Sequence, residues 1–404
     1  MLDLIIIGAG PAGISAAYEA KKHNLEYLVI EKGLIGNTIY NYPVGLTVFS
    51  TTNELEFEPG GLDPAREKPT REELLSYYVR FVLDNELNVQ TEETVLSVHS
   101  AGSAWSAHPV PSVLSVSSVV NNDGIIEQTE SAEGLGVHTD GNTEHTERSE
   151  RTKGAERTER AERREGTANI EGFVIQTDKA VYYSKNILFA IGAMDYPRRL
   201  NVPGEDLPKV HLHFRETYPW VKKRALIIGG GNSAGEAALF LAGEGADTTL
   251  AIFRGDWENN DPKQGCIKYW VKQPLETELK KNCLKLFFLG KVVEITDDAV
   301  VLEEESGSRD VLPNDVVFVL IGADADLTML KRLGVETASV EKYGEVPVYD
   351  EQTFETNVSG VYVAGHFTKQ RHIKGAIDAG KALMPDLAAR IKEESRTEQS
   401  SAQT

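Results

Sequence analysis

The glycine-rich turn near the amino terminus constrains the fold of this chain more than any other feature. Residues 4–7 are Leu-Ile-Ile-Ile, residues 8–13 are Gly-Ala-Gly-Pro-Ala-Gly, and a helical run follows to Lys22. A second apolar strand over residues 27–30 is followed by Glu31. Continuously apolar strands are typical of a parallel sheet that is covered on both faces. This strand-turn-helix-strand unit therefore predicts a dinucleotide-binding α/β fold.

The residues of this first glycine motif have separate tasks. Gly8 makes the tight turn, Gly10 lets the backbone approach a pyrophosphate, and Gly13 allows the helix to pack closely on the strand. Glu31 follows at the usual spacing of about 20 residues, where a carboxylate accepts hydrogen bonds from ribose hydroxyls. Because strand, helix and acid are all in place, the motif indicates nucleotide binding rather than a structural glycine turn.

The same unit occurs again in the middle of the chain. Residues 225–231 are Ala-Leu-Ile-Ile-Gly-Gly-Gly, a helical run extends to about Leu241, and a strand over about 248–253 is followed by Arg254. Two such units imply two dinucleotide-binding domains. Arg254 favours NADPH over NADH, because a guanidinium binds a 2′-phosphate well and no acid stands at the strand tip. Asp256 weakens that assignment, and a merely solvated Arg254 is the alternative.

Charge and cysteine content exclude several classes of protein. The chain has 62 acidic against 42 basic residues and a formal net charge of −20, so nucleic acid and anionic membranes are not expected partners. Its two cysteines, Cys266 and Cys283, form neither a disulfide scaffold nor a CxxC pair, which fits a reducing compartment. No apolar run reaches the ~18 residues of a membrane helix. We therefore expect a soluble, cytoplasmic protein without a metal site, since His211 and His213 have no third ligand at a suitable spacing.

A stretch over residues 99–169 interrupts this folded pattern. Between residues 139 and 168 eight acids and seven bases accompany only three alanines as apolar residues. Such a tract cannot bury a core, which predicts a disordered or loosely helical insert, tolerated in a surface loop. A docking segment for a partner is the alternative interpretation.

Several stretches outside the glycine motifs carry a family resemblance. The order of motifs along the chain resembles that of two-domain flavin reductases of the thioredoxin-reductase-like type. The resemblance rests on the two glycine motifs, the strand ends at 190–192 and 320–322, and residues 356–365. Within that group the chain most resembles the bacillithiol-disulfide reductase family. The remaining matching stretches, which cover nearly the whole chain apart from the insert, are residues 29–32, 39–43, 202–210, 267–270 and 355–358.

The resemblance implies an α/β fold with two Rossmann-like dinucleotide-binding domains, for FAD and for NADPH. We expect the FAD-binding domain to consist of three parts of the chain, residues 1–98, 170–203 and 323–395. The insert would separate the first two parts, and the NADPH-binding domain, residues 204–322, would separate the last two. A disordered tail would follow over 396–404. Hinges near Pro203 to Glu205 and near Gly322 would bring nicotinamide to the flavin.

The same resemblance implies the cofactor-binding residues. Glu31 would hold the adenosine ribose of FAD, Asn37 and Thr38 would lie beside the isoalloxazine, and the helix beginning near Gly375 would direct its positive end at the flavin. The predicted FAD set is Gly8, Gly10, Pro11, Ala12, Gly13, Glu31, Lys32, Asn37, Thr38, Ala190, Gly192, Gly365, His366, Gly375 and Ala376. The predicted nicotinamide-nucleotide set is Gly229, Gly231, Asn232, Ser233, Ala234 and Arg254.

Three departures from the family pattern leave the electron acceptor open. The family keeps a cysteine where this chain has Ala12, the CxxC of thioredoxin reductases is absent, and the flavoenzyme Ala-Gly-Asp motif is here Ala-Gly-His, ending at His366. We interpret Cys266 and Cys283 as packed or incidental thiols. His366 is the single catalytic candidate, either as a donor to a flavin or ribityl oxygen or as a proton donor to a leaving thiolate.

The predicted activity is an FAD-dependent oxidoreductase that passes a hydride from NADPH to FAD and on to a small acceptor. A low-molecular-weight disulfide of the bacillithiol type is the first acceptor, and a small electron-carrier protein is the second. The second corresponds to a ferredoxin- or flavodoxin-NADP reductase, which needs no cysteine at position 12. A flavin monooxygenase and a non-catalytic redox sensor are the further alternatives, and the oligomeric state, including a homo-oligomer, stays open.

Overall fold

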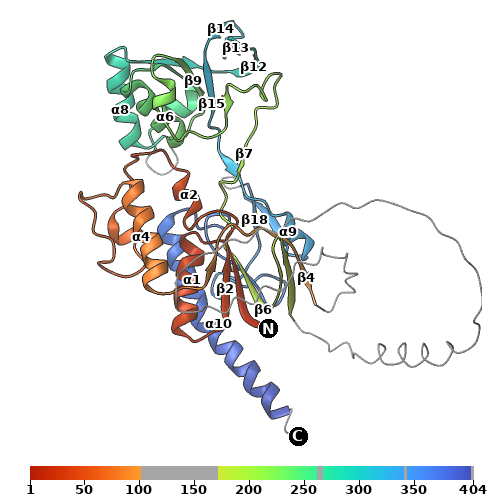
Figure 1. Ribbon diagram of the computed structural model, residues 1–404. Coiled ribbons are helices and arrows are strands. Elements are labelled where there is room, and N and C mark those ends of the chain that lie inside the picture. The colour runs from red at the N-terminus through yellow and green to blue at the C-terminus, as the bar shows by residue number, and fades with distance from the viewer. Residues whose placement is uncertain (102–171, 262–266, 341–343, 402–404) are drawn as a thin grey trace, which may run out of the picture. The chain divides into compact units, whose positions relative to one another are not determined.

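The computed structural model describes residues 1–101, 172–261, 267–340 and 344–401 (Figure 1). Nearly all of the predicted insert lies outside these residues, so the expectation of disorder there stays a prediction. Residues Met1–Ser100 and Gly172–Thr404 form one compact unit. That unit contains two sheets built around the two glycine motifs, a mixed one with a parallel centre and a parallel one.

The first sheet has seven strands, with β1 at its centre between two parallel neighbours, β2 and β6. The path is β3-β2-β1-β6-β5-β4, and the short strand β19 pairs parallel with β6. The strands are apolar because both faces of the sheet are covered. Their bounds are β1 Leu2–Ile7, β2 Tyr27–Ile30, β3 Val89–Gln90, β4 Val95–Ser100, β5 Phe173–Thr177, β6 Val181–Phe189 and β19 Val361–Val363.

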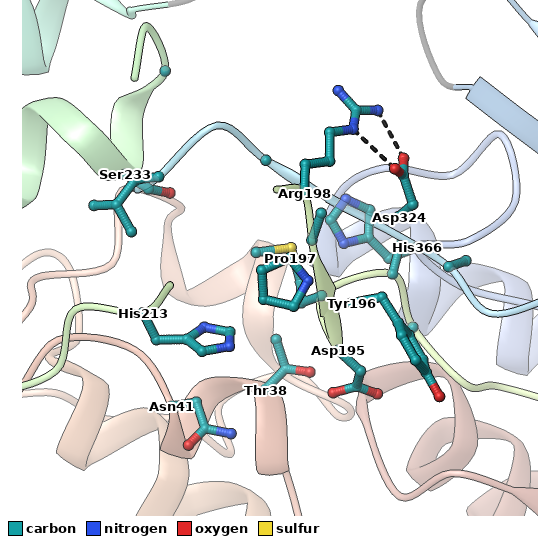
Figure 2. A pocket seen from close by; sticks show the side chains of 18 of the residues that line it. Thr38, Asn41, Asp195, Tyr196, Pro197, Arg198, His213, Ser233, Asp324 and His366 are labelled. Carbon is teal, nitrogen blue, oxygen red and sulfur yellow. Dashed lines mark hydrogen bonds and ion pairs between the residues drawn. The ribbon is translucent and has the colours of Figure 1, made fainter. Parts of the chain in front are cut away.

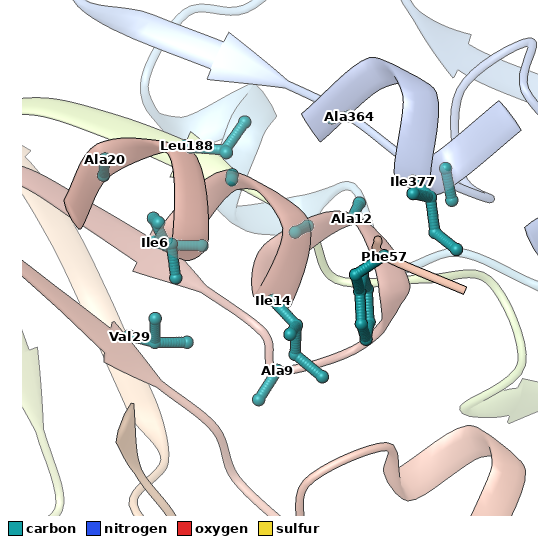
Figure 3. Packing of buried hydrophobic residues seen from close by; sticks show 14 of the residues in the cluster. Ile6, Ala9, Ala12, Ile14, Ala20, Val29, Phe57, Leu188, Ala364 and Ile377 are labelled. Atoms are coloured by element: carbon teal, nitrogen blue, oxygen red, sulfur yellow. The ribbon is translucent and has the colours of Figure 1, made fainter. Parts of the chain in front are cut away.

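Two helices far apart in the sequence lie side by side against this sheet (Figure 1). Helix α1 (Pro11–Lys22) follows the first glycine turn, and α10 (Ile373–Ser401) closes the described chain. The Ser15 hydroxyl donates to the Ile377 carbonyl at 2.8 Å, joining the two helices. Figure 3 shows Ala12 and Ile377 within the same buried cluster. The amino- and carboxyl-terminal parts of the chain therefore build one core.

Helix α10 is longer than the sequence predicted. A disordered tail was expected from residue 396, yet the helix continues to Ser401, so this prediction is wrong for 396–401. These residues include Glu, Arg and Gln, which have good helix propensity, and no Gly or Pro ends the helix among them. Residues 402–404 lie outside the described part of the chain.

The second sheet has five parallel strands in the order β11-β10-β9-β15-β8. The helices α6 and α8 pack beside it, and a three-stranded antiparallel sheet, β12-β13-β14, follows β11 in the chain. The bounds are β8 Val210–His211, β9 Arg224–Ile228, α6 Asn232–Gly243, β10 Asp247–Ile252, α7 Arg254–Glu258, α8 Tyr269–Lys280, β11 Leu284–Phe288, β12 Lys291–Ile295, β13 Ala299–Glu303, β14 Arg309–Pro313 and β15 Val316–Val319.

A small antiparallel ladder pairs the segments that precede and follow the second sheet. Strands β7 (Tyr196–Pro197) and β16 (Ala323–Asp324) form it, and the Arg198 guanidinium makes a bidentate ion pair with Asp324 at 2.7 and 2.9 Å. The predicted hinge near Gly322 lies directly before β16. The remaining elements are α2 Asn37–Tyr40, α3 Thr52–Leu55, α4 Arg71–Asp84, the 3₁₀ turn η2 Tyr218–Trp220, α9 Thr328–Arg332, β17 Thr337–Val340 and β18 Gly344–Pro347.

Candidate dinucleotide and redox site

The first glycine motif has the geometry that its sequence predicts. Gly8 has φ of +111°, and a Cβ there would lie 2.5 Å from the Ala190 carbonyl oxygen. A Cβ at Gly13 would overlap the Gly8 carbonyl, so this glycine lets α1 start against the strand. A Cβ at Gly10 would meet no protein atom within 4 Å, so the turn leaves open space where a phosphate would approach.

Glu31 closes the other side of this turn. One carboxylate oxygen accepts the Ala9 N–H at 2.8 Å and the other accepts the Gly33 N–H at 2.8 Å. Burial raises the pKa of Glu31, and the two backbone donors oppose that shift. The carboxylate is held in place, and its remaining lone pairs can accept ribose hydroxyls.

The second motif repeats this design. A Cβ at Gly229 would overlap the Leu320 carbonyl, while one at Gly231 would meet nothing within 4 Å. Helix α6 begins at Asn232, whose side-chain oxygen accepts the Lys268 N–H at 2.8 Å. Lys268 had no assigned role in the sequence, and this bond ties its segment to the start of α6.

One cavity of about 1330 Å³ is lined by residues of both motifs. A pocket for a single small ligand usually measures about 300–1,000 Å³, so this one exceeds the ordinary size for one such ligand. The predicted residues that line it are Gly8, Gly10, Pro11, Ala12, Glu31, Lys32, Asn37, Thr38, Ala190, Gly192, Gly229, Gly231, Asn232, Ser233, Gly365, His366 and Ala376.

Four predicted residues do not line the cavity: Gly13, Ala234, Gly375 and Arg254. Gly13 and Ala234 act through packing at the helix starts. The Arg254 guanidinium lies 3.9 Å from the centroid of the Phe288 ring.

His366 lies within the cavity wall, as Figure 2 shows. Its pKa is lowered to about 4 by burial, with further lowering from the positive charges of Arg371 and His372. The imidazole is therefore neutral near pH 7. A neutral imidazole suits the predicted role as a hydrogen-bond donor to a ligand oxygen better than the role of acid toward a thiolate.

The cavity also contains residues that sequence reasoning missed. Burial raises the pKa of Glu236 on α6 to about 7, and burial together with the Glu236 charge raises that of Tyr42 to about 12. The Phe49 and Trp270 rings stack with centroids 5.2 Å apart. Trp270 belongs to a family-like stretch, but its partner is more than 200 residues away, so the sequence offered no signal for the pair.

No cysteine among the described residues lines this cavity. Cys283 is exposed after α8, and Cys266 lies outside the described part of the chain. Nor do the described residues bring together three His, Cys, Asp or Glu side chains that could hold a metal ion. His211 instead lies against Trp220 and Phe318, whereas His213 points toward Thr38 in Figure 2.

Known proteins share both the sequence pattern and the fold. The family model for pyridine nucleotide-disulphide oxidoreductase matches residues 5–120 and 165–365. Bacilliredoxin reductase Bdr of Bacillus subtilis is 31% identical over 361 residues, 89% of this chain and 88% of that protein. A ferredoxin-NADP reductase of Ignicoccus hospitalis is 25% identical over 91% of this chain and 90% of its own length.

Solved structures give the same assignment. Bacillithiol disulfide reductase Bdr from Staphylococcus aureus superposes with a TM-score of 0.73 at 28% identity, covering 96% of this chain and 98% of that one. A thioredoxin reductase of T. acidophilum shares the fold, with a TM-score of 0.62 at 19% identity over 96% of this chain and 98% of its own. Within the described residues no helix is long and apolar enough to cross a membrane.

The likeness thus extends over both glycine motifs and both sheets, and it confirms the predicted α/β fold with two Rossmann-like domains. The chain belongs to the pyridine nucleotide-disulphide oxidoreductase family and is an FAD-dependent NAD(P)H oxidoreductase.

Proposed function

We propose that this chain uses NADPH to reduce a small disulfide, with FAD bound at the first glycine motif. The observation that carries the proposal is one cavity whose lining includes both Gly10 and Gly231, each with open space beside it. Bound FAD would supply two-electron transfer between a nicotinamide and an acceptor. The protein's part is to hold the two nucleotides and to admit the acceptor.

The residues of the first motif fit FAD. The open space at Gly10 can take a pyrophosphate, and the buried Glu31 carboxylate can accept an adenosine ribose. Thr38 and Asn41 lie on the cavity wall in Figure 2, where they would lie beside the isoalloxazine. His366 takes the position at which related flavoenzymes have an acid, and its neutral imidazole would bond a ribityl or ring oxygen.

A small disulfide is the acceptor that the relatives favour. The names of the similar proteins include a bacilliredoxin reductase and a bacillithiol disulfide reductase. Reduction of such a disulfide takes two electrons, which NADPH would supply, and the thiols formed stay reduced in the cytoplasmic location that the sequence predicts.

A small electron-carrier protein is the second candidate, and Ala12 is the observation that favours it. Ala12, in the first turn of α1, is 4% exposed and its methyl group lies beside Gly365, so the position offers a methyl group and no thiol to the cavity. An electron carrier needs no such thiol. A disulfide substrate of this chain would have to react at the flavin directly or through Cys266 or Cys283.

The test is anaerobic stopped-flow reduction of the purified holoprotein by NADPH, followed by mixing with one acceptor at a time. Flavin absorbance should bleach with NADPH and return with bacillithiol disulfide, whereas glutathione disulfide serves as a control for acceptor size and charge. Return with ferredoxin or flavodoxin alone would support the second candidate. Return with oxygen alone, or failure to bleach, would contradict both.

A further inference from the structure

A carboxylate lies over the turn of the second glycine motif. Asp256 belongs to the short helix α7 that follows β10, and it lines the cavity. A Cβ built on Gly230 would overlap its Oδ2 atom and lie 3.0 Å from its Cγ atom. The carboxylate therefore stands directly against the residue between the first two glycines of the motif.

The first motif also has a carboxylate beside its middle residue, held there by a hydrogen bond from the backbone. Ala9 stands between Gly8 and Gly10 as Gly230 stands between Gly229 and Gly231, and the Glu31 carboxylate accepts the Ala9 N–H at 2.8 Å. Glu31 directly follows its strand, β2, whereas Asp256 reaches the corresponding place through a turn of α7. Each motif thus has a carboxylate beside its middle residue, although the strand tips differ.

Arg254 does not occupy that place. Its guanidinium lies over the Phe288 ring and is paired with Glu258 at 3.5 Å and with Glu305 at 3.7 Å. These two carboxylates offset its charge, and the side chain is absent from the cavity wall. The group that the sequence offered as a phosphate ligand is therefore engaged elsewhere.

We propose that Asp256 is the ribose ligand of the second nucleotide site and that the site therefore accepts NADH as well as NADPH. A carboxylate accepts hydrogen bonds from the 2′- and 3′-hydroxyls of an unphosphorylated ribose, and it repels a 2′-phosphate. The inference rests on the proposed function, because it assigns the nicotinamide nucleotide to the second motif.

The test measures binding without turnover. NAD⁺ and NADP⁺ are titrated separately into the oxidised holoprotein by isothermal calorimetry. The wild type should bind both nucleotides. Asp256→Ala should weaken NAD⁺ binding about tenfold or more, because charge-assisted hydrogen bonds to the two ribose hydroxyls are lost, while NADP⁺ binds as well or more tightly. Asp256→Asn removes the charge but keeps the shape, so it should also tighten NADP⁺.

Glu244→Gln is the matched control. It removes one carboxylate charge from the same domain, on an exposed residue at the far end of α6 from the motif. Its two affinities should equal those of the wild type, and flavin content should be equal in all variants, which shows that they are folded.

Two results would overturn the inference: a wild type that does not bind NAD⁺, or an Asp256→Ala variant whose ratio of NAD⁺ to NADP⁺ affinity is unchanged. Failure of the proposed function gives a different pattern. In that case both nucleotides bind with the expected dependence on Asp256, yet no disulfide or carrier reoxidises the flavin.

Discussion

At the scale of single residues, we expect a buried carboxylate to contribute to flavin binding. Glu31 is held by the backbone N–H groups of Ala9 and Gly33 and faces the open side of the first turn. Its position is therefore set before any ligand arrives, which reduces the entropy that binding would otherwise lose.

Replacing Glu31 by Ala should weaken FAD binding by about 1–3 kcal/mol, through loss of charge-assisted hydrogen bonds to ribose hydroxyls. The measurement is the dissociation constant of FAD from the apoprotein, followed by flavin fluorescence. Glu26→Ala removes an exposed carboxylate just before β2 and should leave that constant unchanged. Equal FAD affinity in the two variants would show that Glu31 does not hold the ribose.

Glu236 should give the protein a pH-dependent stability. Because its folded pKa of about 7 lies above the ordinary value of 4.5, the native state binds this proton more tightly than the unfolded chain. The contribution of protonated Glu236 to the free energy of unfolding is fully present below pH 4.5 and is lost as the pH rises through 7. The loss is at most about 3 kcal/mol.

The thermal unfolding midpoint of the holoprotein, measured between pH 5 and 9, tests this. The unfolding midpoint of Glu236→Gln should increase relative to that of the wild type as the pH rises, because the amide carries no charge to bury. Midpoints that run parallel over the whole range would contradict the assignment.

At the scale of elements, the contact between α1 and α10 positions the first motif. A Cβ at Gly380 would overlap the Ala12 carbonyl and lie 2.9 Å from the Ala16 nitrogen, so the two backbones meet there without intervening side chains. Helix α1 begins at the glycine turn, and a displacement of the helix therefore moves the turn.

Gly380→Ala should destabilise the protein by about 1–3 kcal/mol, the usual cost of overpacking, and should lower its flavin content. Gly243→Ala is the control, since a Cβ at this helical position of α6 would meet no atom within 4 Å. That variant should be neutral or slightly stabilising. Chemical denaturation of both variants gives the comparison, and equal stabilities would mean that the α1–α10 contact has room to relax.

At the scale of the whole molecule, the first sheet sets where the chain can be shortened. Strands β4 and β5 are antiparallel neighbours, and Ser100 pairs with Phe173. The chain therefore leaves the sheet and returns to it at the same place, which a short turn can join.

Replacing residues 102–171 by a short Gly-Ser turn should leave flavin content and NADPH oxidation near those of the full chain, because closing a shorter loop changes the folding free energy only slowly. Both quantities are measured on the purified protein. Loss of both would show that the replaced residues pack on the body of the protein.

Local sequence was enough to predict both glycine motifs and the strands and helices around them. Gly8, Gly10 and Gly13 lie within six residues, and their tasks depend on backbone conformation and on the strand and helix directly beside them. The family resemblance added the order of the two sheets. The predicted tail was wrong because it followed the polar composition of these residues, whereas their helix propensity is good and no residue between 396 and 401 stops a helix.

Only the tertiary structure decided which side chains line the cavity. Residues close in sequence, such as Arg254 and Asp256, end on different sides of α7, one over Phe288 and the other over Gly230. Phe49 and Trp270, distant in sequence, meet in one stack. A glycine turn is specified by a few neighbouring residues, whereas a cavity wall depends on packing between elements that the sequence does not order in space.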